Sequence, residues 1–312
     1  MGTITTISPI FIVMAIGWVA RKRGFIPAPF LAPANRLVFY LAIPAMVFRA
    51  ISKGTIGRHF NGTGLFICLG SALGVYALAW IISHLRRMPA ARAGAFTQSA
   101  AHGNHGYVGL PVAFYVLGDQ GLVQASIIAG FLMILQNVTS TIVLHHEAAR
   151  GNAGTDRGKA FGQLLGNPII LSAMAGILCS LFHVPLPLVV QRTLDMLGGL
   201  APPMALLLIG ASLSVERMRQ FFRPAMGAVL IKLVLLPGIG LLLFSAFGMT
   251  AAEFLPGLLL LATPTATVAY VMAREMDGDP DFAVATISAS TLFSALTYSL
   301  WLMLVHALFT AA

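Results

Sequence analysis

Long apolar runs, separated by short polar segments, divide this sequence from end to end and constrain its fold more than any other feature. Of its residues, 58% are hydrophobic and 9% are charged, whereas a soluble domain carries about 25% charged residues. A helix needs about 20 mainly apolar residues to cross a bilayer. Ten runs approach or exceed that length, at residues 4–21, 34–51, 63–85, 93–117, 121–145, 165–183, 187–214, 222–247, 253–273 and 281–309. Because lipid offers no partner to an open strand edge, we predict an all-α membrane protein with ten transmembrane helices.

The basic residues predict the orientation of these spans. The formal net charge is +9, but the cations form short clusters between apolar runs rather than a basic stripe with interleaved aromatics, so nucleic acid is not an expected partner. Cytoplasmic loops of membrane proteins are enriched in Lys and Arg. With the first span running inward, fourteen basic residues fall on the inner side, against Arg49, Lys53 and Arg58 on the outer side. We therefore expect a multi-pass protein of the cytoplasmic (inner or plasma) membrane with both termini extracytoplasmic.

A polar segment at residues 147–162 divides the chain nearly in half. It is rich in glycine and charge, which is typical of a flexible linker, and we expect it on the cytoplasmic side between a first five-helix repeat (1–146) and a second (163–312). A shift of 159 positions aligns SPI and LAIP of the first half with NPI and LAPP of the second. Five spans per half is an odd number, so the second copy must cross the bilayer in the opposite sense. Such a 5+5 inverted repeat is the plan of many secondary transporters.

The fourth and ninth spans each contain residues that interrupt a helix. Residues 103–112 read GNHGYVGLPV and residues 261–271 read LATPTATVAYV, with their prolines in correspondence at a shift of 153 positions. A proline removes a backbone donor, and a glycine permits an unwound chain. The residues expected to break the two helices are Gly103, Gly106, Gly109, Pro111 and Pro264. A broken helix persists in a membrane only where protein or a watery cavity satisfies the released backbone groups. The alternative is that these residues merely kink a helix or let two helices pack closely.

Two broken helices that meet near the bilayer midplane can form a site for an anion. The N-terminus of a half-helix carries a partial positive charge and unpaired N–H groups, which suit a carboxylate. The residues expected to contact such a substrate are Asn104, His105, Gly106, Thr263, Thr265 and Thr267.

These motifs resemble those of the auxin efflux carrier family, which includes plant PIN-type carriers and bacterial permeases for malonate or malate. NHGYVGLP at 104–111 is similar to the family's fourth-span pattern, and TPTATVAYVMAREMDGDPD at 263–281 is similar to its ninth span. Gln136 matches a fifth-span glutamine, which adds it to the expected substrate-binding residues. Lys232 falls where PIN-type carriers have a basic residue before a proline. The resemblance covers essentially the whole chain.

The resemblance implies a ten-helix fold shared with bile-acid symporters and some sodium/proton antiporters, in which helices 4 and 9 cross. Helices 1, 2, 6 and 7 would form a scaffold, often with a homodimer contact, and helices 3–5 and 8–10 would form a transport unit. The long inner loop of the plant carriers is reduced here to residues 147–162. Regulation through that loop is therefore not carried over.

Four ionisable residues within or beside the spans could have functional roles. His102 and His105 flank the expected break, and because histidine titrates near neutral pH, either could couple proton movement to transport. A neutral imidazole hydrogen-bonded in a polar cavity is the alternative. Lys232 is costly within a span unless it snorkels to the headgroups or contacts the break in the ninth span. Asp195 follows Arg192 by three residues, and we expect those two to form an ion pair.

No enzyme, metal or cofactor motif is complete in the sequence. HHEAAR at 145–150 lacks the second histidine of a zinc protease motif, and GASLS at 210–214 lacks the closing glycine of a serine-nucleophile turn. Cys68 and Cys179 lie singly within apolar runs, without the spacing of a metal site.

We therefore predict a secondary active transporter, or facilitated carrier, of a small organic anion, a mono- or dicarboxylate, that works by alternating access. Its expected partners are that substrate, the lipid bilayer and a second copy of the chain, with proton coupling possible. One alternative is a sodium-coupled symporter of the bile-acid type, which is disfavoured because no acidic residue accompanies Asn104. Another is an intramembrane enzyme or a signalling receptor.

Overall fold

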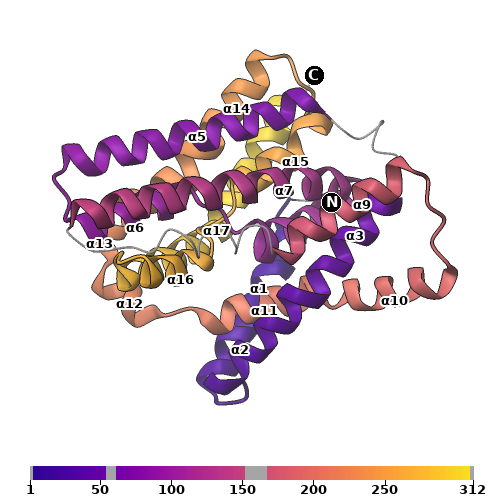
Figure 1. The fold of residues 1–312 in the computed structure, drawn as a ribbon, viewed down its shortest axis with the longest axis horizontal. Helices are drawn as coiled ribbons and strands as arrows, with labels where there is room; N and C mark the ends of the chain where they lie inside the picture. The colour runs from indigo at the N-terminus through magenta and orange to yellow at the C-terminus, as the bar shows by residue number, and fades with distance from the viewer. Residues whose placement is uncertain (1–2, 54–60, 152–166, 310–312) are drawn as a thin grey trace. The chain divides into compact units, whose positions relative to one another are not determined.

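The computed structural model describes residues 3–53, 61–151 and 167–309, and over these ranges the chain is helical, with no strand beyond a single isolated bridge (Figure 1). The first half contains α1 (Thr3–Lys22), α2 (Ala28–Leu37), η1 (Val38–Ala42), α3 (Ile43–Lys53), α5 (Gly62–Leu85), α6 (Ala90–Ala101), η2 (His105–Gly109) and α7 (Leu110–Arg150). The second half contains α9 (Pro168–Leu181), α10 (Leu188–Gly199), α11 (Ala201–Ser212), α12 (Val215–Gln220), α13 (Phe222–Leu230), η3 (Ile231–Leu235), α14 (Leu236–Ala246), α15 (Ala251–Leu261), α16 (Val268–Glu275) and α17 (Pro280–Phe309).

Six of the described helical stretches are long and apolar enough to cross a membrane. They are Ala28–Lys53, Gly62–Leu85, His105–Arg150, Leu188–Ser212, Phe222–Ala246 and Pro280–Phe309. Two shorter helices, α9 and α15, are also apolar. The predicted all-α membrane protein is thus confirmed to this extent.

The helix α7 contains two helices joined at a tight turn. Gly118 has φ 69° and ψ −164° inside it, a backbone conformation that glycine adopts readily because it lacks a Cβ. The helix is therefore kinked at Gly118, between the predicted fourth and fifth spans. After this turn α7 continues to Arg150, so that residues 147–150 of the predicted linker form its last turn. Residues 152–162 of that linker lie outside the described residues.

Each of the three described π-helical turns stands immediately before an α-helix that has proline as its second residue. The turns η1, η2 and η3 precede Pro44, Pro111 and Pro237, respectively. Proline cannot donate the usual hydrogen bond one turn back, and a local π-turn is one way for a helix to accommodate the missing donor. These prolines therefore modify continuous helices rather than end them.

By its internal contacts the chain forms two compact units. The first comprises Met1–Gly62, His105–Phe131 and Gly166–Leu213, and the second comprises Thr63–Asn104, Leu132–Leu165 and Ser214–Ala312.

The first unit contains two closely packed helix pairs, α1 with α11 and α3 with α9. An added Cβ at Gly17 would collide with the backbone carbonyl of Leu207, and one at Gly176 would lie 3.2 Å from the carbonyl oxygen of Phe48. Small residues allow the backbones of membrane helices to approach closely, and the resulting van der Waals packing stabilises the pair.

We expect Gly210→Val to destabilise the first unit, because a Cβ at Gly210 would collide with the carbonyl group of Met14 on α1. Overpacking of a well-packed interface costs about 1–3 kcal/mol or more. The matched control is Gly70→Val in α5, where an added Cβ meets no atom within 4 Å. Thermal unfolding in detergent should show a lower Tm for the Gly210 variant. An equal Tm for both variants would contradict the packing of α1 on α11.

The second unit is arranged around α17, which packs against α6, α12, α13 and α16. Part of its core is formed by Val229, Leu233 and Ala289, with Phe293 packed against them. The start of α17 is fixed by Asp279, whose Oδ1 accepts a hydrogen bond from the N–H three residues later at 3.0 Å. Because α17 packs directly on α6 and α16, it contacts one half of each of the two interrupted helices.

Candidate functional site

Two interrupted helices of the second unit meet at their breaks. The helix α6 ends just before residues 102–104, and α15 ends just before residues 262–267. The two segments run antiparallel, and Gly103 and Thr265 form an isolated bridge. The flanking backbone hydrogen bonds are Asn104 N to Pro264 O (2.8 Å) and Ala266 N to His102 O (2.9 Å). Each break thus satisfies backbone groups that the other leaves without helical partners, as a non-helical backbone in a membrane requires.

The break in the fourth span lies at residues 102–104 rather than at the proline. Pro264 lies in its break, but Pro111 is the second residue of α7 and follows the π-helical turn η2, which contains Gly106 and Gly109. The two prolines therefore do not occupy equivalent places in the crossing. Of the glycines expected to break this span, Gly103 alone lies in the antiparallel bridge.

Gln136 holds the first break together. Its Oε1 accepts a hydrogen bond from Gly103 N at 3.0 Å, and its Nε2 donates one to Ala101 O at 3.2 Å. The side chain is fully buried. Both ends of the amide therefore bind backbone, on either side of the point where α6 ends. The structure places Gln136 as a clamp on the break.

The threonines of the second break have different roles. Thr263 Oγ1 donates to Leu260 O at 2.7 Å, and Thr265 Oγ1 donates to Ser99 O at 2.8 Å. A hydroxyl has one proton to donate, so neither can also donate to an anion while these bonds last. Thr267 is half-buried at the start of α16 and its hydroxyl makes no hydrogen bond within residues 3–53, 61–151 and 167–309. Of the three predicted threonine ligands, Thr267 alone has a hydroxyl proton to offer.

Three side chains cap the carbonyl end of α15. The last carbonyls of a helix have no partner within it, and in α15 each of the final three accepts a side-chain hydrogen bond. The donors are Tyr298 Oη to Leu259 O (3.0 Å), Thr263 Oγ1 to Leu260 O (2.7 Å) and Lys232 Nζ to Leu261 O (2.8 Å). Lys232 is fully buried and therefore does not snorkel. Its ammonium group lies at the negative end of the α15 dipole, where a cation is stabilising.

His102 belongs to a buried hydrogen-bonded chain beside the first break. Its Nδ1 lies 3.0 Å from Ser140 Oγ, which lies 2.7 Å from Tyr76 Oη. Tyr76 also donates to Gln136 O at 3.2 Å. This chain connects the break to α5 and α7 through residues that are all fully or nearly fully buried.

The remaining predicted residues, Asn104, His105 and Gly106, are divided between the two units. Asn104 is 4% exposed, and it is the last residue of the second unit before the chain enters the first unit at His105. His105 and Gly106, both buried, begin η2 in the first unit. The same turn is anchored within that unit by Tyr107, whose hydroxyl donates to Asn35 O at 3.0 Å.

The predicted pairing of Asp195 with Arg192 is wrong. Asp195 binds Arg49 instead, with Nε to Oδ1 at 2.8 Å, and lies 3.7 Å from Lys53 Nζ. Both partners are on α3, which packs against α10 in the first unit. Tertiary packing thus supplies a partner that spacing within one helix did not indicate.

Several residues that support the crossing were not among those predicted. Ser290 Oγ accepts from Thr265 N at 3.0 Å, and Ser140 and Tyr298 make the contacts given above. The available signal was a polar side chain within an apolar run, because such a residue in a membrane span has to find a partner.

The arrangement suits recognition of a small anion. The start of α16 offers the partial positive charge of a helix N-terminus, with the Thr267 hydroxyl at the N-cap position. Lys232 Nζ donates to the last carbonyl of the preceding half-helix, α15, at 2.8 Å.

The sequence is similar to those of several known proteins over nearly its whole length. The chain is 28% identical over 303 residues to a protein of Rhizobium meliloti (strain 1021) named "Putative malonate transporter", covering 96% of this chain and 94% of that protein. It is 22% identical over 304 residues to an "Uncharacterized transporter" of Methanothermobacter thermautotrophicus, covering 96% and 98%. It is also 21% identical over 300 residues to a protein of Escherichia coli (strain K12) with the name "Uncharacterized transporter YfdV", covering 94% and 95%.

The pattern that defines the family described as "Membrane transport protein" matches residues 3–302. This match spans both interrupted helices and every predicted site residue. The chain therefore belongs to the Membrane transport protein family, which is the auxin efflux carrier family.

Proposed function

We propose that this protein is a secondary transporter of a small organic anion, a mono- or dicarboxylate, which binds at the crossing of the two broken helices. The observation that carries the proposal is the paired break itself. Two extended segments satisfy each other's backbone, while Thr267 keeps a hydroxyl proton at a half-helix N-terminus. The name of the Rhizobium meliloti relative, a malonate transporter, supports a carboxylate as substrate.

The packing of the first unit supports an inverted repeat. Gly17 of α1 faces the carbonyl of Leu207, and Gly176 of α9 faces the carbonyl of Phe48. Gly17 and Gly176 are 159 positions apart, and so are Phe48 and Leu207. The first span of one half therefore packs on the second span of the other half in both cases, which is the pattern expected for two copies related by a pseudo-two-fold axis.

The crossing supports the same relation. A shift of 162 positions converts Asn104 and Pro264, joined by one backbone hydrogen bond, into Ala266 and His102, joined by the other. Gly103 and Thr265 exchange places under the same shift. We infer a 5+5 fold of ten spans, like that of bile-acid symporters, with helices 4 and 9 crossing.

The two compact units suggest how access alternates. The first unit contains spans 1, 2, 6 and 7 together with His105–Phe131, which includes the end of span 4 and the start of span 5. We assign spans 1, 2, 6 and 7 as the scaffold and the site of a homodimer contact. The second unit contains the crossing and would carry the substrate. Proton movement through His102 or His105 is the coupling that we favour, in the cytoplasmic membrane with both termini outside.

Uptake into proteoliposomes tests the proposal. Purified protein should move labelled malonate, or another small carboxylate, into the vesicle lumen without chemical change. An imposed proton gradient should drive accumulation, and an imposed sodium gradient should not. Conversion of the label would support an enzyme, and absence of flux for a panel of mono- and dicarboxylates would contradict the proposal.

We expect Thr267→Val to slow uptake about tenfold, because one hydrogen bond to a charged group contributes about 1.5–3 kcal/mol. Asn104→Ala should abolish uptake while the protein remains folded. The matched control is Thr193→Val in α10, whose hydroxyl donates within its own helix, to Val189 O at 2.9 Å. Wild-type uptake rates in the Asn104 or Thr267 variant would remove that residue from the site.

A further inference from the structure

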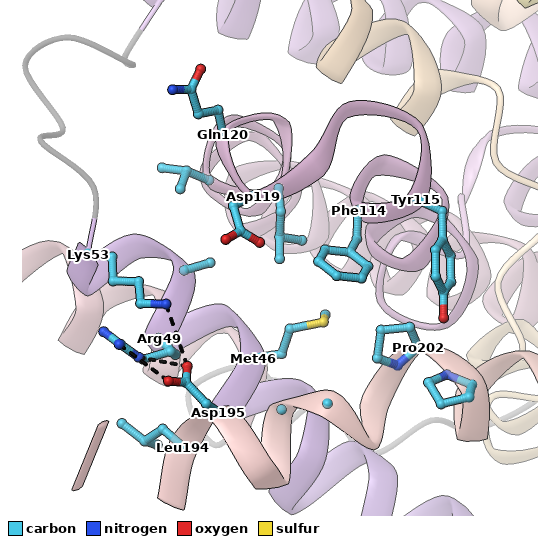
Figure 2. A pocket seen from close by; sticks show the side chains of 16 residues that line it. Met46, Arg49, Lys53, Phe114, Tyr115, Asp119, Gln120, Leu194, Asp195 and Pro202 are labelled. Carbon is cyan, nitrogen blue, oxygen red and sulfur yellow. Dashed lines mark hydrogen bonds and ion pairs between the residues drawn. The ribbon is translucent and has the colours of Figure 1, made fainter. Parts of the chain in front are cut away.

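The first unit contains a cavity of about 510 Å³ (Figure 2), and none of the residues that line it belongs to the crossing. One wall is a single face of α3, another is a single face of α10, and the third is the part of α7 around its turn at Gly118. The cavity lies where α3 ends and α7 turns, along the second half of α10 and the first turn of α11. It therefore lies toward one end of the helices, and the distribution of basic residues predicts that this is the outer end.

The cavity contains two cationic side chains, Arg49 and Lys53, and two carboxylates, Asp119 and Asp195. Arg49 and Asp195 neutralise each other through two contacts of 2.8 and 3.4 Å, and Arg49 also donates to Gln191 at 3.0 Å. Lys53 lies 3.7 Å from the same carboxylate, with 47% of its side chain exposed. Asp119 is exposed and makes no hydrogen bond or ion pair within the described ranges. Figure 2 shows Lys53 and Asp119 on different walls of the cavity.

Most of the other lining residues are apolar, and Tyr115 and Gln120 add a hydroxyl and an amide. Met46, Phe114 and Pro202 lie away from the Arg49–Asp195 pair, as Figure 2 shows. Gly199 also lines the cavity, and an added Cβ there meets no atom within 4 Å. The volume falls within the range of about 300–1,000 Å³ that is typical of ligand sites. The cavity therefore suits a molecule with a small polar part and an adjoining apolar part.

We propose that this cavity binds a zwitterionic phospholipid with a primary amine, namely phosphatidylethanolamine. Its phosphate would bind at Lys53, beside Arg49, and its ammonium group would donate to Asp119. The glycerol and the first methylenes of an acyl chain would lie against Met46 and Phe114. Net neutrality favours a zwitterion, because an anion would meet Asp119 and Asp195 as well as the cations. The helix ends favour a lipid, because headgroups lie at that depth of the bilayer.

Native mass spectrometry of the delipidated full-length protein tests the proposal. The protein is titrated in detergent with phosphatidylethanolamine, phosphatidylcholine and phosphatidylglycerol of the same acyl chains. One phosphatidylethanolamine should be retained about tenfold more tightly than the other two, since hydrogen bonds to charged groups contribute about 1.5–3 kcal/mol. Choline carries the charge but cannot donate, and phosphatidylglycerol lacks the cation. Equal retention of the three lipids would overturn the proposal.

Variants locate the bound lipid. Gly199→Leu should fill the cavity and remove the tight adduct, whereas Gly70→Leu in α5, where an added Cβ also has no neighbour within 4 Å, should retain it. Asp119→Asn should abolish the preference for ethanolamine over choline, and Lys53→Met should weaken both lipids. An added Cβ at Gly199 or Gly70 meets no atom within 4 Å, and Asn and Met are no larger than the Asp and Lys side chains they replace, so Tm without lipid should stay close to the wild-type value. A tight adduct that survives Gly199→Leu would place the lipid elsewhere.

Competition distinguishes a lipid from a free zwitterion. Leucine and glycerophosphoethanolamine carry the same charges without acyl chains. Neither should displace the bound phosphatidylethanolamine at millimolar concentration. Displacement by either would show that the cavity takes a soluble zwitterion, which would overturn the lipid assignment.

Discussion

Gln136→Leu is expected to lower the initial rate of carboxylate uptake about 100-fold. The substitution removes the hydrogen bonds to Gly103 N and Ala101 O and leaves both backbone groups buried without a partner. Each loss is expected to cost about 1.4 kcal/mol or more, which together corresponds to a factor of about 100 in the equilibrium constant for the correctly paired crossing. The rate is measured with labelled malonate in proteoliposomes that contain equal amounts of inserted protein.

The neighbouring amide is the matched control for that variant. Asn137 is on the same helix, but its Nδ2 donates to Met133 O at 2.8 Å, within α7. Asn137→Leu should therefore transport at nearly the wild-type rate. Gln136→Glu should retain more activity than Gln136→Leu, because the carboxyl group can still accept from Gly103 N. Equal rates for Gln136→Leu and Asn137→Leu would show that the amide clamp is dispensable.

The helical class and the presence of a disturbance in the fourth and ninth spans could be predicted because both follow from local chemistry, whereas the crossing was expected from the repeat and the family resemblance. Apolar runs of spanning length have to be helical in lipid, and glycine and proline within them indicate a disturbance. The sequence did not indicate whether each proline ends a helix or is accommodated within one. Pro111 follows a π-helical turn in a continuous helix, whereas Pro264 lies in a true break. The difference depends on the partner segment, because residues 102–104 stay extended only while residues 264–266 supply their backbone hydrogen bonds.

The roles of the site residues depended on the same tertiary partners. The sequence indicates that Thr263, Thr265 and Gln136 are polar groups in an apolar setting, but it does not indicate what each one binds. Thr265 donates to Ser99 O, 166 positions away, and that bond uses the proton that a substrate would need. Asp195 shows the same effect, since its partner Arg49 is 146 positions away while the expected partner is three. Residues could thus be selected by type, but donors already in use could be identified only from the fold.

Lys232→Met is expected to lower the uptake rate about 100-fold, and the loss should exceed that of any neutral change at the same helix end. The methionine side chain keeps the length but removes the donor to Leu261 O. An unpaired buried carbonyl costs about 1–3 kcal/mol. Removal of a buried cation from a helix C-terminus costs up to about 2 kcal/mol more. The second cost is absent for Tyr298→Phe, which removes only the neutral hydrogen bond to Leu259 O.

The comparison of these two variants separates the charge of Lys232 from its hydrogen bond. If the ammonium group acts by stabilising the end of α15, Tyr298→Phe should lower uptake only about fivefold, in keeping with one neutral hydrogen bond of about 1 kcal/mol. Lys22→Met, at the exposed end of α1, controls for loss of a cation elsewhere and should transport normally. Equal losses in the Lys232 and Tyr298 variants would mean that the carbonyl cap matters and the charge does not. In that case the charge of Lys232 would not contribute to anion binding at the crossing. Only the N-terminus of α16 and Thr267 would then remain as groups that attract the anion.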